Sequence, residues 1–343
     1  MDLFDFMRNE NMEKDSPLAS RLRPTTLDEV VGQEHIIGKD KLLYRAIKAD
    51  KLSSIIFYGP PGTGKTTLAK VIANTTSAEF TQINATVAGK KDMEEVVKEA
   101  KDLQGMYGKK TILFIDEIHR LPKQVEEVLY PAMEDYCLDI VVGKDSATVH
   151  NIRINLPPFT LVGATTRAGD LSAPLRDRFG IISQLEYYNL EDLEKIVYRT
   201  SCVMDTKIEK DAVREIALRS RGTPRIANRL FRRVRDFAQV YNDGIVSTEI
   251  AQTALDRLRV DHLGLDAVDH KYLKGIIERF KGGPVGLEAI ASSIGEEPMT
   301  LEDVYEPYLL QIGFINRTPR GRIVTPKAYE HLQITYQKDL FTD

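Results

Sequence analysis

The sequence lacks several features that would assign a protein to a class at once. It has no tryptophan and only two cysteines, Cys137 and Cys202, in 343 residues. This pair fits neither a disulfide framework nor metal-ligand spacing, so we expect both cysteines to be reduced and half-buried. No apolar run reaches the length of a membrane-spanning helix, and the N-terminus has no basic segment before an apolar core. The sequence therefore predicts a cytoplasmic protein.

A strong charge of either sign is also missing. Lysine and arginine together number 47 against 51 acidic residues, for a formal net charge of −4. A basic field over the whole protein is therefore absent, and any contact with DNA must come from local patches. The length favours two or three domains.

The hydrophobic pattern changes twice along the chain. Residues 18–187 alternate apolar runs with amphipathic stretches, which predicts an α/β domain with a parallel sheet. Residues 188–260 show helical periodicity alone, as expected for a small α-helical domain, and residues 261–336 read as three short helices and a hairpin, a winged-helix pattern. Residues 1–17 are polar and predict a mobile tail, in which an apolar knot at residues 3–6 rests on the body or docks on a partner.

Within the first domain we expect five strands and four helices. The expected strands are residues 54–58, 79–83, 111–115, 160–164 and 181–186. The expected helices lie near residues 40–49, 65–75, 91–103 and 123–135.

A phosphate-binding loop is the clearest motif. Residues Gly59–Thr66 fit the pattern G-x-x-x-x-G-K-[ST], between an apolar strand and a helix. Glycines let backbone N–H groups turn toward phosphate, and the helix N-terminus favours negative charge. Lys65 is expected to reach the β- and γ-phosphates, and the Thr66 hydroxyl to bind Mg²⁺. An ordinary glycine-rich turn would not fill every fixed position.

Two other predicted strands end in polar residues. The apolar run 111–115 leads into Asp116, a candidate for the Mg²⁺ shell, and Glu117, a candidate to polarise the attacking water. The strand near 160–164 should lie between strand 111–115 and the strand that precedes the phosphate-binding loop, so that Thr165 reaches the γ-phosphate or the water. Alternatively, Thr165 only caps the following helix.

Arginines suggest that the site is completed from elsewhere. Arg178, with Arg176 as second choice, precedes a strand and is a candidate arginine finger inserted into a neighbouring subunit; a surface salt-bridge run is the alternative. Arg225 opens a helix of the second domain and could fold back on the nucleotide, unless it is a solvated helix charge.

Two hairpins suggest partners. Arg317, Arg320 and Arg322 cluster on the turn of the predicted wing, where they could grip DNA phosphates without sequence preference. The preceding helix is acidic, which argues against reading of a major groove, and a protein contact by the wing is the alternative. The hairpin 138–156 interrupts the ATPase pattern and predicts a partner surface, or else a hairpin buried on its own domain.

Together these parts mark an AAA+ ATPase, and residues 116–331 resemble the RuvB family of Holliday-junction branch-migration ATPases. The stretches that carry this resemblance are Asp116–Leu121, Leu129–Asp135, Leu156–Thr160, Gly163–Gly169, Gly222–Arg229 and Arg317–Arg322. Residues 1–120 look more like RarA/MgsA, a clamp-loader-related AAA+ family of stalled forks, and Thr63 stands where RuvB usually has leucine. The chain thus resembles a RarA-like front joined to a RuvB-like remainder, natural or engineered.

The RuvB resemblance implies a hexameric ring that uses ATP and Mg²⁺, moves DNA, and docks hairpin 138–156 on a RuvA-like junction-binding partner. It implies that Arg178 is the finger, that Arg225 is the second-domain sensor, and that Arg317 and Arg322 touch DNA. Pro298 stands where a further DNA contact is often arginine. The residues implied for nucleotide binding are Leu22, Arg23, Tyr188 and Pro224 around adenine, and Gly62, Thr63, Gly64, Lys65, Thr66 and Thr67 around the phosphates.

Two other functions remain open from the sequence. One is a RarA-like ATPase at stalled replication forks, whose N-terminal tail would contact a sliding clamp. The other is a non-catalytic adaptor that holds ATP as a structural ligand, against which the intact Lys65, Glu117 and Arg178 argue.

Overall fold

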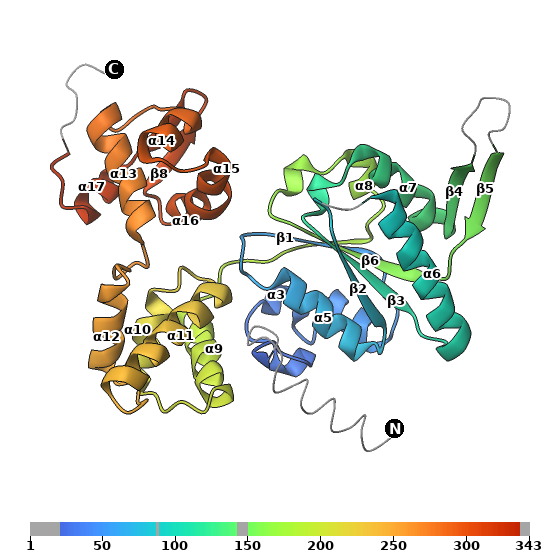
Figure 1. Cartoon of the computed structure of the whole chain (residues 1–343), viewed down its shortest axis with the longest axis horizontal. Helices are drawn as coiled ribbons and strands as arrows, with labels where there is room; N and C mark the ends of the chain where they lie inside the picture. The colour runs from blue at the N-terminus through green and yellow to red at the C-terminus, as the bar shows by residue number, and fades with distance from the viewer. Residues whose placement is uncertain (1–20, 87–88, 143–149, 337–343) are drawn as a thin grey trace. The chain divides into compact units, whose positions relative to one another are not determined.

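The computed structural model describes residues 21–86, 89–142 and 150–336 (Figure 1). The chain separates into two compact units, one ending at Tyr188 and the other beginning at Asn189. The tail expected at residues 1–17, with its proposed clamp contact, lies outside the described residues. Within the described chain, every helix is too short or too polar to cross a lipid bilayer.

A five-stranded parallel sheet forms the centre of the first unit, in the order β2-β3-β6-β1-β7. Its strands are β1 (Ile55–Tyr58), β2 (Glu79–Asn84), β3 (Thr111–Asp116), β6 (Phe159–Thr165) and β7 (Ile181–Gln184). All five expected strands are confirmed, and β6 lies between β3 and β1 as predicted. Because the strands are parallel, their carboxyl ends meet at one edge, where Tyr58 of β1 pairs with Thr165 of β6.

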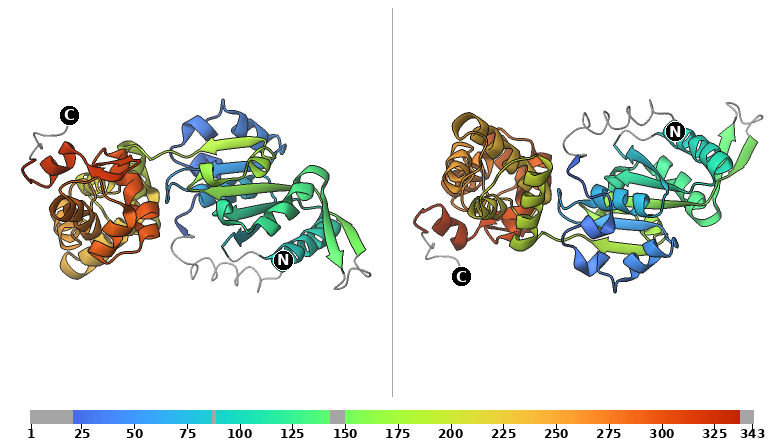
Figure 2. Two further views of the ribbon diagram at one scale, coloured as in Figure 1. Left: turned by 90° about the horizontal axis from the view of Figure 1, so that it is seen from above. Right: turned by 90° about the horizontal axis from the view of Figure 1, so that it is seen from below.

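Helices cover both faces of this sheet (Figure 2), so its three central strands, β3, β6 and β1, are buried on both sides. One face packs against η1 (Leu27–Glu29), α3 (Glu34–Ile37), α4 (Leu42–Lys48) and α5 (Lys65–Thr75). The other packs against η2 (Ile118–Arg120), α6 (Lys90–Tyr107), α7 (Lys123–Asp135) and α8 (Ala173–Arg176). The short turn η3 (Ala168–Asp170), which precedes α8, has no buried residue. Side chains alternate between the faces, with Phe57 and Phe114 in one core and Ile56 and Ile115 in the other.

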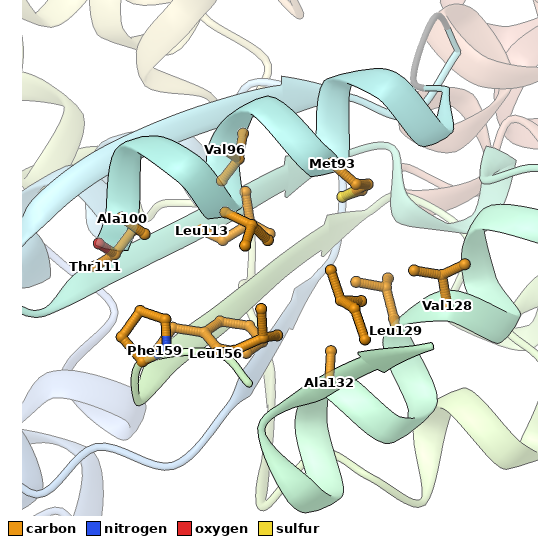
Figure 3. Close-up of a pocket in the computed structure, with 13 residues that line it drawn as sticks. Met93, Val96, Ala100, Thr111, Leu113, Val128, Leu129, Ala132, Leu156 and Phe159 are labelled. Carbon is orange, nitrogen blue, oxygen red and sulfur yellow. The ribbon is translucent and has the colours of Figure 1, made fainter. Parts of the chain in front are cut away.

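A two-stranded antiparallel ribbon interrupts the α/β order, as expected for hairpin 138–156. It consists of β4 (Cys137–Val142) and β5 (His150–Asn155), and its turn lies outside the described residues. At its base, α6 and α7 enclose an apolar cavity of about 40 Å³, across which Met93 and Val96 face Leu129 and Ala132 (Figure 3). No lining residue belongs to the phosphate-binding loop, so we interpret the cavity as a packing void.

The second unit begins with a four-helix bundle: α9 (Leu190–Val203), α10 (Lys210–Leu218), α11 (Pro224–Tyr241) and α12 (Thr248–Arg257). Local chemistry sets two of its helix starts. The side chain of Asn189 accepts the amide of Asp192 at the start of α9, and Ser247 accepts that of Ile250 at the start of α12.

A winged-helix fold completes the second unit, as predicted. Its elements are α13 (Ala267–Phe280), α14 (Leu287–Ile294), α15 (Pro298–Thr300), the π-helical turn η4 (Leu301–Tyr305), α16 (Glu306–Gln311), β8 (Ile315–Thr318), β9 (Gly321–Val324) and α17 (Pro326–His331). An isolated antiparallel bridge joins Val285 to Arg322 of the β8–β9 hairpin. The final helix α17 is an element that we did not predict.

Asp261 organises the connection between the bundle and the winged helix. Its Oδ1 accepts the amides of Leu263 and Leu265 at 2.9 and 2.8 Å, while Oδ2 lies 3.1 Å from His270 Nε2 and 2.7 Å from His331 Nε2. Burial by itself would raise the pKa of Asp261, but the hydrogen bonds from His270, the Leu265 amide and His331 outweigh it and hold the pKa well below its usual range.

The prediction that both cysteines are reduced agrees with the structure, but the prediction that both are half-buried is wrong. Both cysteines are free thiols, but Cys137 is buried and Cys202 is exposed.

Candidate nucleotide site and DNA-facing wing

The phosphate-binding loop has the backbone that its glycines predict. Gly62 and Gly64 have φ angles of 82° and 99°, in the left-handed region that other residues avoid. At Gly59, a Cβ atom would run into the backbone carbonyl of Leu185. The loop therefore packs against the segment that follows β7 at a distance that only glycine permits.

Lys65 is a buried cation at the first position of α5, with 8% of its surface exposed. Its Nζ donates hydrogen bonds of 2.8 Å to the carbonyl oxygens of both Gly59 and Pro60. Burial lowers its pKa to about 8, while the nearby charges of Glu117 and Asp116 act in the opposite direction. Three of the predicted catalytic side chains, Lys65, Asp116 and Glu117, are thus close enough to interact electrostatically.

The edge of β3 and β6 holds a residue that the sequence reasoning missed. His119, whose side chain is 7% exposed, places Nδ1 2.8 Å from the Thr165 hydroxyl and 3.5 Å from Glu117 Oε2. Thr165 itself is fully buried and accepts the Arg167 amide. The threonine therefore reaches Glu117 through His119, and its expected contact with phosphate or water stays a prediction. An imidazole two residues after Glu117, within one turn, was the available signal.

Three of the four residues predicted to surround the adenine base, Leu22, Arg23 and Tyr188, belong to the first unit, at two places far apart in sequence. Tyr188 donates its hydroxyl to the Thr63 carbonyl at 3.2 Å, which ties the loop to the end of the unit. Leu22 and Arg23 are half-buried. Gln33, which we did not predict, exchanges two hydrogen bonds with the backbone of Glu186 through its amide.

Arg178 is held against its own domain. It pairs with Glu134 of α7 at 2.9 Å, donates to the Pro174 carbonyl at 2.6 Å and lies over the ring of Tyr130. Arg176, the second choice, is exposed. The role of either arginine as a finger stays a prediction.

Pro224 and Arg225 belong to the second unit, where they begin α11. Proline suits the first helical position, because no N–H is needed there. Pro298, at the expected further DNA contact, begins α15. The predicted approach of Pro224 and Arg225 to the nucleotide stays a prediction.

The wing contains an ion-pair network that we did not predict. Glu306 is fully buried and lies 2.5 Å from Arg317 Nη2 and 2.9 Å from Arg322 Nε, while Tyr272 donates its hydroxyl to it at 2.7 Å. Glu302 faces the same two arginines at 3.6 and 3.4 Å. The acidity of this helix therefore partly serves internal pairing and does not by itself exclude the helix from a DNA groove.

The three wing arginines consequently differ. The Arg322 side chain is only 16% exposed and Arg317 is 42% exposed, and both are ion-paired. Arg320, at the turn, is exposed, and no ion pair to it is found in the part of the chain that the structure describes. Arg320 is thus the most available of the three for an external phosphate.

Models of known protein families match all three domains of the chain. The P-loop domain of the Holliday-junction DNA helicase RuvB matches residues 22–185, the RuvB AAA lid domain matches residues 188–261, and the RuvB C-terminal winged-helix domain matches residues 262–333. The chain belongs to the RuvB family. RuvB proteins are AAA+ P-loop ATPases of a family of branch-migration motors that acts on DNA junctions.

Solved RuvB structures support the same assignment. The chain is similar to the Thermotoga maritima RuvB Holliday-junction branch-migration motor, with 46% identity, a TM-score of 0.80, and coverage of 92% of this chain and 100% of that one. It is also similar to a single-substitution variant of that RuvB, with 46% identity, a TM-score of 0.81, and coverage of 92% and 99%.

The front of the chain fits the RuvB family as well. The RuvB P-loop model extends over residues 22–185 without a break, so it includes most of the region for which we noted similarity to RarA/MgsA.

The residues present fit Mg²⁺. Thr66 supplies a hydroxyl at the start of α5, and Asp116 supplies a carboxylate at the end of β3; one of its oxygens accepts the Glu117 amide at 3.2 Å. Hydroxyl and carboxylate oxygens are hard ligands of the kind that Mg²⁺ prefers.

Proposed function

We propose that this RuvB-family chain is an ATP-driven DNA translocase that drives Holliday-junction branch migration as a hexameric ring with a RuvA-like partner. The observation that carries the proposal is the buried Lys65, electrostatically coupled to Asp116 and Glu117 in a chain that also has a winged helix. We also propose the domain boundaries 18–187, 188–260 and 261–336 for this motor.

Each side chain of the proposed site has a distinct task. Lys65 exchanges its two carbonyl partners for the β- and γ-phosphates, which requires only a change of hydrogen bonds. Glu117 orients and polarises the attacking water, and His119 holds Glu117 relative to Thr165. Mg²⁺ bound by Thr66 and Asp116 would neutralise phosphate charge. The backbone of residues 62–67 cradles the phosphates.

The remaining tasks belong to residues outside the loop. Arg178 leaves Glu134 and enters the site of a neighbouring subunit, where it stabilises charge on the γ-phosphate. Arg225 contacts the nucleotide from the second unit. The wing, with Arg320 foremost, contacts DNA phosphates, and hairpin 138–156 docks on the RuvA-like protein.

A branch-migration assay on a synthetic four-way junction tests the proposal. The wild-type chain with a RuvA-like protein and ATP should convert the junction to duplex products, whereas Glu117→Gln should bind ATP and lose turnover by at least about a hundredfold. Wild-type ATP turnover without junction conversion would contradict the translocase. Unchanged turnover in Glu117→Gln would favour a non-catalytic ATP-binding adaptor, with the measured ATPase coming from a contaminant.

A pull-down separates the remaining alternative. The wild-type chain should retain a RuvA-like protein, and a variant lacking residues 143–149 should lose it. Capture of a sliding clamp without a RuvA-like protein would instead favour a RarA-like role at stalled forks.

A further inference from the structure

The loop before the predicted sensor Arg225 reaches into the winged helix. Arg221, only 5% exposed, has a positive φ of 50° and donates from Nε to the Gly264 carbonyl at 2.6 Å. Its guanidinium also contacts Asp269, which is fully buried, and lies 3.3 Å from Asp266. Arg221 thus joins the loop that starts α11 to the first turn of α13.

Helix α13 connects Asp269 to a second buried contact one turn further along. Asp269 and Tyr272 are three residues apart, so they lie on the same face of the helix. The Tyr272 hydroxyl donates to Glu306 at 2.7 Å, and both residues are fully buried. Tyr308 of α16 lies beneath the Arg221 guanidinium, with 5.6 Å between Cζ and the ring centroid.

Glu306 ends the series at the wing. Its two oxygens receive Arg317 Nε at 2.8 Å and Arg322 Nε at 2.9 Å. The contacts therefore run from the start of α11, through one face of α13, to the two arginines of the wing hairpin, with Glu306 as the last buried link.

Packing alone does not require this series. A buried ionic or polar contact stabilises a fold little better than apolar side chains of similar volume, whereas its geometry is specific. Displacement of the α11 loop must move Arg221, and the Asp269 carboxylate must follow it or lose a buried charge partner. The series is therefore better explained by a role in passing a displacement of the α11 loop to the wing than by a contribution to stability.

We propose that Arg221, Asp269, Tyr272 and Glu306 are positioning residues that couple nucleotide sensing at the start of α11 to the placement of the wing arginines on DNA. This inference rests on the proposed function, because it assumes that Arg225 senses nucleotide and that the wing binds DNA. Coupling of this kind is reciprocal: nucleotide changes DNA affinity by the same factor by which DNA changes nucleotide affinity.

The test measures that factor in Tyr272→Phe, which removes one hydroxyl and retains the ring, and in Arg221→Lys. Affinity for a fluorescent duplex is measured with ADP and with a non-hydrolysable ATP analogue. Burial raises the pKa of Asp269 to about 7, so the affinities are measured at pH 8, above that pKa, where the carboxylate is charged. The ratio of the two affinities should fall toward one in both variants, while ATP turnover without DNA is retained.

Tyr329→Phe is the matched control, since Tyr329 is a buried tyrosine of the same domain core outside the series. It should keep the wild-type ratio. If Tyr272→Phe also keeps the wild-type ratio with unchanged thermal unfolding, the coupling inference is wrong. If the wild-type chain itself shows no DNA binding or no ATPase, the proposed function has failed instead, and the two failures are distinguishable.

Discussion

The two regions that we propose to bind phosphate, the nucleotide loop and the wing, hold their cations in opposite ways. Lys65 of the nucleotide site is held by carbonyl dipoles, with the nearest carboxylates acting at longer range. Arg317 and Arg322 of the wing are bound directly to the buried carboxylate of Glu306. A lysine can exchange a neutral carbonyl partner for a phosphate at a small cost in free energy. Removing the arginines from a buried carboxylate costs much more, because an unpaired buried charge remains.

The comparison indicates that the loop is built to exchange partners and the wing is built to keep them. The Glu306 carboxylate is the more demanding arrangement: burial alone would raise its pKa, but hydrogen bonds from Arg322 and Tyr272 and the nearby arginine charges lower it, so it is ionised at neutral pH. Three experiments would break or sharpen this contrast.

The largest effect is expected for Glu306→Gln. Loss of the carboxylate leaves both arginines with only their longer contacts to Glu302. Breaking a fully buried pair costs about 3–5 kcal/mol, which is an upper bound here because Arg317 is 42% exposed. Hydrogen exchange of the amides in α13 and α16 should accelerate accordingly, because this method reports local opening without a two-state assumption. Glu302→Gln, at a 28% exposed side chain, is the control and should change exchange much less. Equal effects of the two substitutions would contradict the assigned role of Glu306.

A smaller effect is expected from the titration of Lys65. Phosphate favours the charged amine, so nucleotide binding should raise its pKa from about 8 and take up a proton. Affinity for ADP should therefore fall as the pH rises above 8, by up to about tenfold per pH unit. Calorimetric titration at pH 8.5 in two buffers of different ionisation enthalpy measures the uptake. Lys65→Arg remains charged and should show none; uptake in that variant would assign the proton to another group.

The smallest effect is expected for Arg320→Ala. An exposed arginine that contacts one DNA phosphate contributes about one unit to the slope of log affinity against log salt. In the Arg320→Ala variant this slope should be smaller by about one unit, and the thermal stability should equal that of the wild type. Arg322→Ala, at a mostly buried position, should instead lower stability. A wild-type salt slope in Arg320→Ala would remove this residue from the interface.

Sequence patterns predicted the elements of this fold well because the patterns are local. The three central strands, β3, β6 and β1, are buried on both faces and read as short apolar runs, and a glycine-rich loop between a strand and a helix has few other structures. The position of β6 between β3 and β1 was predicted, whereas the edge positions of β2 and β7 were not. The final helix α17 was missed because six residues carry too little periodicity.

The partners of individual side chains were not predictable in the same way. Glu306 looked like a surface acid of a helix, and only the tertiary fold, which brings α16 beside β8 and β9, turns it toward Arg317 and Arg322. His119 and Thr165 are 46 residues apart, and they meet because β3 and β6 are neighbours. Charge and spacing name the candidate residues, whereas long-range contacts decide which task each can perform.

Tyr188 links the loop to the boundary of the first unit. It is the last residue of that unit, and its hydroxyl is bonded to a carbonyl within the phosphate-binding loop. A ligand that reshapes the loop therefore also acts on the segment through which the chain passes to Asn189, because the 3.2 Å hydrogen bond joins the two.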